Sequence, residues 1–139
     1  MAVFSFGDIE NAFLFVGSAP YGENEAYLDT ETGRIFYRSD MGGIDEIAEN
    51  EVDPDELTAI PHKNDLDLGK ALVFEFVASD LPDEYDRVRD IFSRRGAYGR
   101  FKDLLDSKEL LEAWYRFEDD REKEAIRYWC EKNKIELSD

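Results

Sequence analysis

The chain has 139 residues, with 17 Lys or Arg, 34 Asp or Glu, one His and one Cys, and its formal net charge is −17. This length is typical of a single domain, and 42% hydrophobic with 14% aromatic residues excludes a disordered, low-complexity chain. One Cys cannot form an internal disulfide, and one His with one Cys cannot form a Cys/His zinc cluster.

The N-terminal residues do not look like a secretion signal. Residues 1–6 lack a basic segment, and no apolar run in the chain approaches the 18 residues that a membrane-spanning helix needs. We therefore expect a cytoplasmic protein that does not contact a membrane.

The charge is unevenly distributed. Residues 40–67 contain 10 acidic residues against Lys63 alone, whereas residues 87–102 contain six basic residues against Asp90 alone. Charged runs are usually solvated surface, but two runs of opposite sign also offer sites for charged partners. The candidate binding residues are Arg94, Arg95, Arg100 and Lys102 in the basic band, and Asp45, Glu46 and Glu49 in the acidic segment.

The first 40 residues predict a helix and a hairpin. Ser5 and Asp8 fit a helix-capping pattern, apolar residues then follow at helical spacing, and Gly17 can end the helix. The apolar run 12–16 also leaves a strand open as an alternative. Two short runs, 26–28 and 34–38, flank a turn that contains Gly33 and predict a β-hairpin.

Residues 41–62 contain weaker signals. The Met41-Gly42-Gly43 run breaks the strand pattern and allows the chain to bend away. Asp53 before Pro54 predicts one helical turn over 53–56. Residues 58–62 are a candidate third strand, at whose end or edge Pro61 must lie because it cannot donate a ladder hydrogen bond.

The second half of the chain reads as helical. Leu68, Leu72 and Phe76 are spaced four apart, which predicts a helix from about residue 65, although 71–74 also resembles a buried strand. A second helix begins at Pro82, has Tyr85, Val88, Ile91 and Phe92 on its inner face, and ends at Gly96.

Three further helices follow. The first begins near Tyr98, and the other two are marked by the apolar residues of 110–117 and 125–130. We assign to the core the aromatic residues on these helical stripes, namely Trp114, Tyr115, Phe117 and Trp129.

Together these elements predict an α+β fold. A small antiparallel sheet with an N-terminal helix precedes a helical C-terminal half. We expect one domain over residues 1–139, with the helix, hairpin and acidic segment in 1–64 and the helical part in 65–139.

A set of short motifs then points to a family. In chain order these are Tyr27-Leu28-Asp29-x-x-Thr32-Gly33, Ala59-Ile60-Pro61, Arg95-Gly96-Ala97-Tyr98-Gly99-Arg100-Phe101-Lys102-Asp103, Trp114-Tyr115-x-Phe117 and Ala125-x-x-x-Trp129. Over roughly residues 5–135 the chain resembles the bacterial uncharacterised protein family 0158. The resemblance supports the fold and a bacterial cytoplasmic setting, and it implies no catalytic residues. The 40–56 segment and the 18–24 loop depart from the family pattern.

The sequence contains few residues or motifs that indicate catalysis or cofactor binding. His62 lies at a predicted strand end, and Cys130 lies on an apolar helical stripe without a cationic neighbour, so we expect an inert core thiol. The Asp53-x-Asp55 pair begins like a calcium loop, but Thr58 stands where the loop needs Gly. Gly96-x-x-Gly99 lacks the strand and the Lys of a phosphate loop. We therefore expect no metal and no cofactor.

The sequence favours a non-catalytic protein-interaction or regulatory module that uses its charged surfaces. Two alternatives stay open. One is a carboxylate-dependent enzyme with a cleft between sheet and helices, and the other is nucleic-acid binding by the basic band 87–102. The net charge of −17 disfavours nucleic acid.

Overall fold

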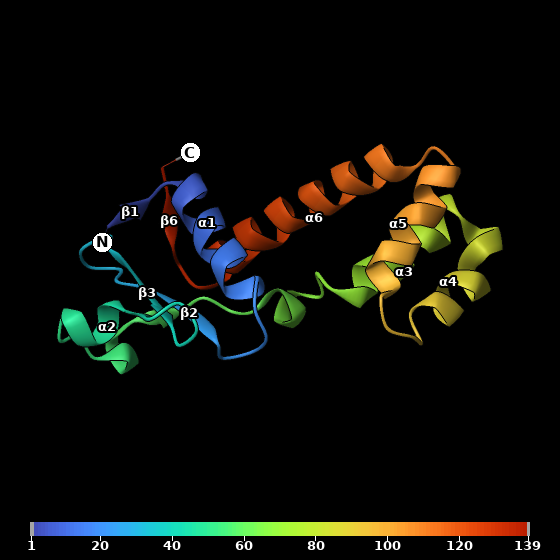
Figure 1. The fold of residues 1–139 in the computed structure, drawn as a ribbon. Helices are drawn as coiled ribbons and strands as arrows, with labels where there is room; N and C mark the ends of the chain where they lie inside the picture. The colour runs from blue at the N-terminus through green and yellow to red at the C-terminus, as the bar shows by residue number, and fades with distance from the viewer. Residues whose placement is uncertain (1, 139) are drawn as a thin grey trace. The chain divides into compact units, whose positions relative to one another are not determined.

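The computed structural model describes residues 2–138, which divide into two compact units (Figure 1). Unit 1 contains residues 1–66 and 123–139, and unit 2 contains residues 67–122. Each unit has its own cluster of buried hydrophobic side chains. The fold is α+β, as the sequence predicts.

The N-terminal helix of unit 1 forms as its capping pattern predicts. Helix α1 spans Phe6–Gly17, and the Ser5 hydroxyl accepts a hydrogen bond from the Asp8 backbone N–H at 3.1 Å. Its buried face includes Ile9, Phe13 and Val16, which belong to the unit 1 core together with residues of the sheet. The strand alternative for 12–16 is therefore wrong.

A four-stranded antiparallel sheet lies beside α1. Its spatial order is β4 (Ile44–Asp45), β3 (Ile35–Ser39), β2 (Asn24–Leu28) and β5 (Thr58–Ala59). The predicted hairpin is thus confirmed as β2 and β3, and the predicted third strand is the short edge strand β5. The Met41-Gly42-Gly43 run does not send the chain away from the sheet; it forms the turn that returns it as β4.

Short helical turns follow the sheet strands. Helix α2 (Glu46–Glu49) begins at the Asp45 cap, and the 3-10 turn η1 (Pro54–Glu56) begins at Asp53, whose carboxylate accepts from the Asp55 N–H at 2.9 Å. The turn predicted over 53–56 is therefore confirmed. A further 3-10 turn, η2 (Lys63–Leu66), ends the N-terminal part of unit 1.

Unit 1 also contains a strand pair that the sequence does not predict. Strand β1 (Val3–Phe4) pairs in parallel with β6 (Glu136–Leu137), so the two ends of the described chain lie side by side (Figure 1). Two-residue strands carry no periodic signal, and their partners lie more than 130 residues apart. Local sequence patterns therefore cannot reveal this pairing.

Unit 2 is entirely helical. It contains α3 (Lys70–Asp80), the 3-10 turn η3 (Pro82–Glu84), α4 (Tyr85–Ile91), α5 (Ala97–Ser107) and the first part of α6 (Leu111–Lys132). The predicted helix from residue 65 starts later, at Lys70, and the strand alternative for 71–74 is wrong. Gly96 precedes α5 with φ 72° and does not end α4, whose C-cap is Phe92.

The two helices predicted over 110–117 and 125–130 are one helix. Helix α6 spans 22 residues without interruption. Its middle is highly charged and contains neither Gly nor Pro, so nothing in the sequence breaks the helix there. The sequence predicts two helices because the charged stretch between them lacks apolar residues, but a solvated helical segment needs none.

Three of the four aromatic side chains assigned to the core are buried at least in part. Trp114 is fully buried, and Phe117 and Trp129 pack against the cores of their units. Tyr115 was predicted wrongly, because its side chain is 46% exposed. Among the described residues 2–138, no helix is long and apolar enough to span a membrane.

Candidate functional site

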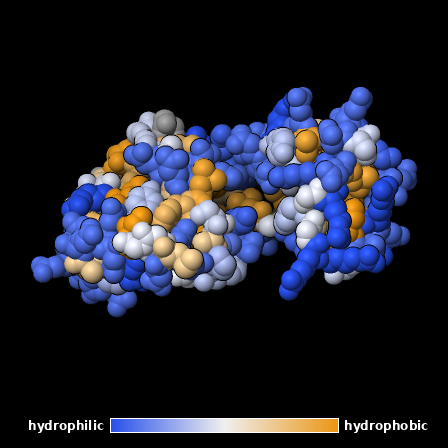
Figure 2. Space-filling model, viewed as in Figure 1, coloured by the Kyte–Doolittle hydropathy of each residue, from blue (hydrophilic) through white to orange (hydrophobic). Residues whose placement is uncertain are grey.

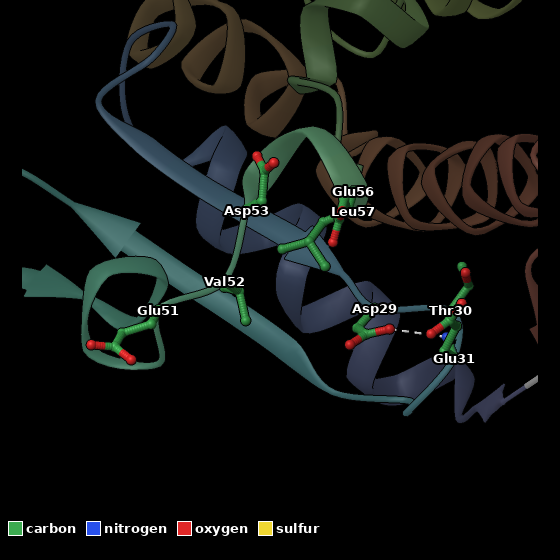
Figure 3. Close-up of a pocket in the computed structure, with 8 residues that line it drawn as sticks. All are labelled: Asp29, Thr30, Glu31, Glu51, Val52, Asp53, Glu56 and Leu57. Carbon is green, nitrogen blue, oxygen red and sulfur yellow. Dashed lines mark hydrogen bonds between the residues drawn. The ribbon is translucent and has the colours of Figure 1, made fainter.

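Unit 1 contains a hollow of about 660 Å³ in which five of the eight lining residues are acidic, and we call it the acidic hollow (Figure 3). It forms where the turn between β2 and β3 lies opposite the segment that links α2 to β5. Its lining consists of Asp29, Thr30, Glu31, Glu51, Val52, Asp53, Glu56 and Leu57.

Two of the five carboxylates also stabilise the backbone that shapes the hollow. Asp29 accepts hydrogen bonds from the backbone N–H groups of Glu31 at 3.0 Å and Thr32 at 3.3 Å. These bonds, led by the one from Glu31, lower the pKa of Asp29, so this carboxylate stays charged. Asp53 caps η1 in the same manner.

The other three carboxylates have no partner of their own. Glu31, Glu51 and Glu56 are exposed, and none of their side chains makes a hydrogen bond or ion pair among the described residues. No Lys, Arg or His lines the hollow. Arg34, which donates to the Asn50 side chain at 3.1 Å and lies over the Phe36 ring, also contributes to the lowered pKa of Asp29 through its charge. Glu31, Glu51 and Glu56 therefore carry the negative charge of the hollow that no ion pair among the described residues compensates.

The three acidic residues chosen from the sequence lie on or beside α2, next to the hollow and not in its lining. Asp45 accepts from the Ala48 N–H, and Glu46 accepts from the Tyr37 N–H at 2.9 Å, so both hold local structure. Glu49 is exposed. The acidic run 40–67 supplies three of the five acidic residues of the hollow, whereas Asp29 and Glu31 come from the turn of the hairpin.

The four basic residues chosen from the sequence differ in their contacts. Arg94 pairs with Asp90 at 3.8 Å, and Lys102 lies over the ring of Tyr115, with 5.5 Å between its Nζ and the ring centroid. Arg95 and Arg100 are exposed and make no ion pair among the described residues. Since each helical residue turns by about 100°, Arg100 lies on a different side of α5 from Lys102.

The aromatic residues of the basic band are also separated. Phe101 is buried, and Tyr98, which has core spacing in the sequence, is 46% exposed with its ring edge against Phe92. Nucleic-acid stacking needs several exposed rings beside a row of cations. Tyr98 is the one exposed ring among the aromatic residues of α5, and the other exposed ring beside a cation of the band is Tyr115 on α6, under Lys102.

His62 and Cys130, the residues that a nucleophilic mechanism would need as base and nucleophile, have structural roles. The His62 Nε2 lies 2.9 Å from the Ala19 carbonyl, and its Nδ1 accepts from the Asn64 N–H at 3.2 Å, which fits a neutral ring with both nitrogens occupied. Burial raises the pKa of the Cys130 thiol to about 11. Cys130 is therefore the inert core thiol that the sequence predicts.

The remaining observations concern metal ligands, surface hydropathy and a second cavity. Among residues 2–138, no group of three or more His, Cys, Asp or Glu side chains is arranged to hold a metal ion. The face in Figure 2 is mostly hydrophilic, with smaller hydrophobic areas. A second, smaller cavity of about 200 Å³ lies in unit 1, beside Tyr21 and His62.

Comparison with known proteins gives a family and nothing more specific. The model of the Uncharacterised protein family (UPF0158) matches residues 12–138. No curated protein and no solved structure matches the chain. The matched region covers most of the sequence and includes the hairpin, the acidic segment and all of unit 2. The chain therefore belongs to the UPF0158 family.

Proposed function

We propose that this protein is a non-catalytic interaction module that binds a Lys- and Arg-bearing segment of a partner protein in the acidic hollow. The observation that carries the proposal is the lining itself, which contains five acidic residues and no Lys, Arg or His around a hollow of about 660 Å³. A basic segment would bring Lys or Arg side chains to Glu31, Glu51 and Glu56, the three carboxylates that lack partners.

The charge of residues 1–66 as a whole favours the same kind of partner. Residues 1–66 contain 15 acidic side chains and only Arg34, Arg38 and Lys63 as cations. Arg34 and Arg38 are held by Asn50 and Glu25, respectively. A surface with such an excess of one sign accelerates encounter with oppositely charged proteins and repels polyanions.

The proposal is tested by capture from bacterial lysate, with nuclease added in parallel. The test variant is the double charge reversal Glu51→Lys and Glu56→Lys. Its matched control is Glu131→Lys with Glu136→Lys, which changes the net charge equally at exposed positions of unit 1 outside the hollow. We expect a basic protein to bind the unmodified chain and the control, but not the test variant, and to bind again as purified protein.

Other outcomes separate the alternatives. Nuclease-sensitive recovery of nucleic acid that is lost in Arg95→Glu with Arg100→Glu would replace the proposal with nucleic-acid binding by the basic band. A purified partner that binds both double variants equally would also contradict it, because the hollow would then contribute nothing beyond net charge. A carboxylate-dependent enzyme would be indicated by turnover that Glu51→Gln abolishes.

A further inference from the structure

The second cavity of unit 1 combines features that the acidic hollow lacks. It has a volume of about 200 Å³ and lies between the 18–24 loop, the start of β2 and the segment that follows β5. Its apolar wall includes the buried side chains of Val16, Ala26 and Ile60. Two tyrosines, Tyr21 and Tyr27, and two carboxylates, Glu25 and Asp65, also line it.

The Tyr21 ring is held in place although its side chain is 59% exposed. It stacks on the His62 ring with centroids 4.3 Å apart and an interplanar angle of 28°. Its hydroxyl donates to an Asp65 carboxylate oxygen at 3.1 Å. His62 is itself fixed by hydrogen bonds at both ring nitrogens. The cavity therefore has a pre-positioned aromatic ring in its lining.

The two carboxylates differ in whether a cation already neutralises them. Glu25 accepts from the Tyr27 hydroxyl and from Arg38, whose Nη2 lies 2.5 Å from the carboxylate, so its charge is compensated. Asp65 accepts only from the Tyr21 hydroxyl and the His62 backbone N–H. No Lys or Arg among the described residues pairs with Asp65.

An aromatic ring beside an uncompensated carboxylate and an apolar wall suits an organic cation. Ring faces attract ammonium and guanidinium groups, the carboxylate supplies the counter-charge, and the wall covers the aliphatic part of the ligand. A bare metal ion would need several oxygen ligands, and no such group of residues occurs in the described chain. The volume suffices for a guanidinium group with a short alkyl stem.

We propose that the cavity lined by Tyr21, Tyr27 and Asp65 is a binding site for an alkylguanidinium or alkylammonium group. Such a group occurs on Arg and Lys side chains and on free organic amines. The site does not depend on the acidic hollow, since the two cavities share no lining residue.

The test measures binding of n-butylguanidinium to the full chain by calorimetry and by amide chemical shifts at 150 mM salt. n-Butylurea is the matched neutral probe, because it has nearly the same shape without the charge. We expect n-butylguanidinium to bind with a millimolar dissociation constant, to shift the Gly22 amide, and to bind at least tenfold more tightly than n-butylurea.

Variants locate the site. Tyr21→Ala and Asp65→Asn should each weaken binding at least fivefold, whereas Tyr21→Phe keeps the ring and should retain most of it. Tyr128→Ala removes an exposed tyrosine elsewhere in unit 1 and should have no effect. Glu51→Lys with Glu56→Lys should change binding less than twofold, so failure of the acidic hollow and failure of this site are distinguishable.

The source of the group is distinguished by comparing n-butylguanidinium with the blocked tripeptide Ac-Ala-Arg-Ala-NH2. Tighter binding of the peptide assigns the site to a protein side chain, and tighter binding of n-butylguanidinium assigns it to a free small-molecule cation. Equal binding of n-butylurea, binding that Tyr21→Ala leaves unchanged, or no shift of Gly22 at tens of millimolar probe would overturn the proposal.

Discussion

Gly96 and Gly99 lie three residues apart and have opposite backbone requirements. Gly96 has φ 72°, a left-handed conformation, whereas Gly99 lies inside α5, and a Cβ at either position meets no atom within 4 Å. Gly96→Ala should therefore lower the free energy of unfolding by about 1 kcal/mol through backbone strain alone. Gly99→Ala should raise it by up to about 1 kcal/mol through helix propensity. Urea denaturation of both variants would show whether the free energy of unfolding decreases in the first and increases in the second.

Cys130 predicts a pH dependence of stability. Burial raises its pKa from 9.0 to about 11, so the unfolded chain loses the thiol proton more readily than the folded chain. The stabilisation from the neutral thiol is complete below pH 9 and is lost as the pH rises towards 11. The loss should amount to roughly 2 kcal/mol in the free energy of unfolding.

The matched variant for this prediction is Cys130→Ala, which removes the titrating group. Urea unfolding of both proteins at pH 8 and pH 10.5 isolates the contribution of the thiol from those of tyrosines and lysines. The difference in stability between the two proteins should shrink at the higher pH. A difference that stays constant would mean that Cys130 titrates normally in the folded chain.

Single residues differ in how well the sequence reveals them. The inert state of Cys130 follows from its apolar helical stripe, and the burial of Phe101 follows from its spacing. Tyr98 and Tyr115 have the same spacing as core residues but lie at the edge of the buried face, where exposure depends on the neighbouring helix. The spacing of hydrophobic residues predicts which side of a helix faces the core, but it does not predict how wide the buried face is.

At the scale of elements, α6 gives the clearest test. Asp120 is exposed in the charged middle of this helix, where the sequence suggested a break. Asp120→Pro should lower the free energy of unfolding by about 3 kcal/mol or more, because Pro removes a helical hydrogen bond and clashes with the preceding turn. Asp120→Ala should raise the free energy of unfolding by a few tenths of a kcal/mol. Urea denaturation followed by circular dichroism checks both variants. If Asp120→Pro left the free energy of unfolding unchanged, the middle of α6 would be a linker and not a helix.

The elements that could be predicted are those with local chemical signals. Ser5 and Asp53 mark the starts of α1 and η1, and Gly33 marks the turn between β2 and β3. The β1–β6 pair and the single α6 could not be predicted in this way. The β1–β6 pair depends on contacts between residues that are distant in the sequence. The continuity of α6 depends on its charged middle segment, which is helical but contains no periodic apolar residues that would predict a helix.

At the scale of the whole molecule, charge is the property that the sequence conveys best. The acidic run 40–67 contains five of the eight residues that line the hollow, but it does not reveal Asp29 and Glu31, which come from another segment. Asp45 and Glu46, predicted as binding residues, accept backbone N–H groups in the structure. Carboxylates that cap helices or accept backbone N–H groups cannot be distinguished by composition from those that face solvent.

The central claim is that the acidic hollow, and not the net charge, binds basic segments. The most direct measurement is the affinity of a fluorescent peptide of alternating Lys and Ala for three forms of the chain at 100 mM salt. The peptide should bind the Glu51→Lys, Glu56→Lys variant at least tenfold more weakly than the unmodified chain, since two contact carboxylates are lost. It should bind the Glu131→Lys, Glu136→Lys control within about threefold of the unmodified chain, through the screened long-range charge alone. Equal weakening in the two variants would contradict the account, because binding would then follow net charge.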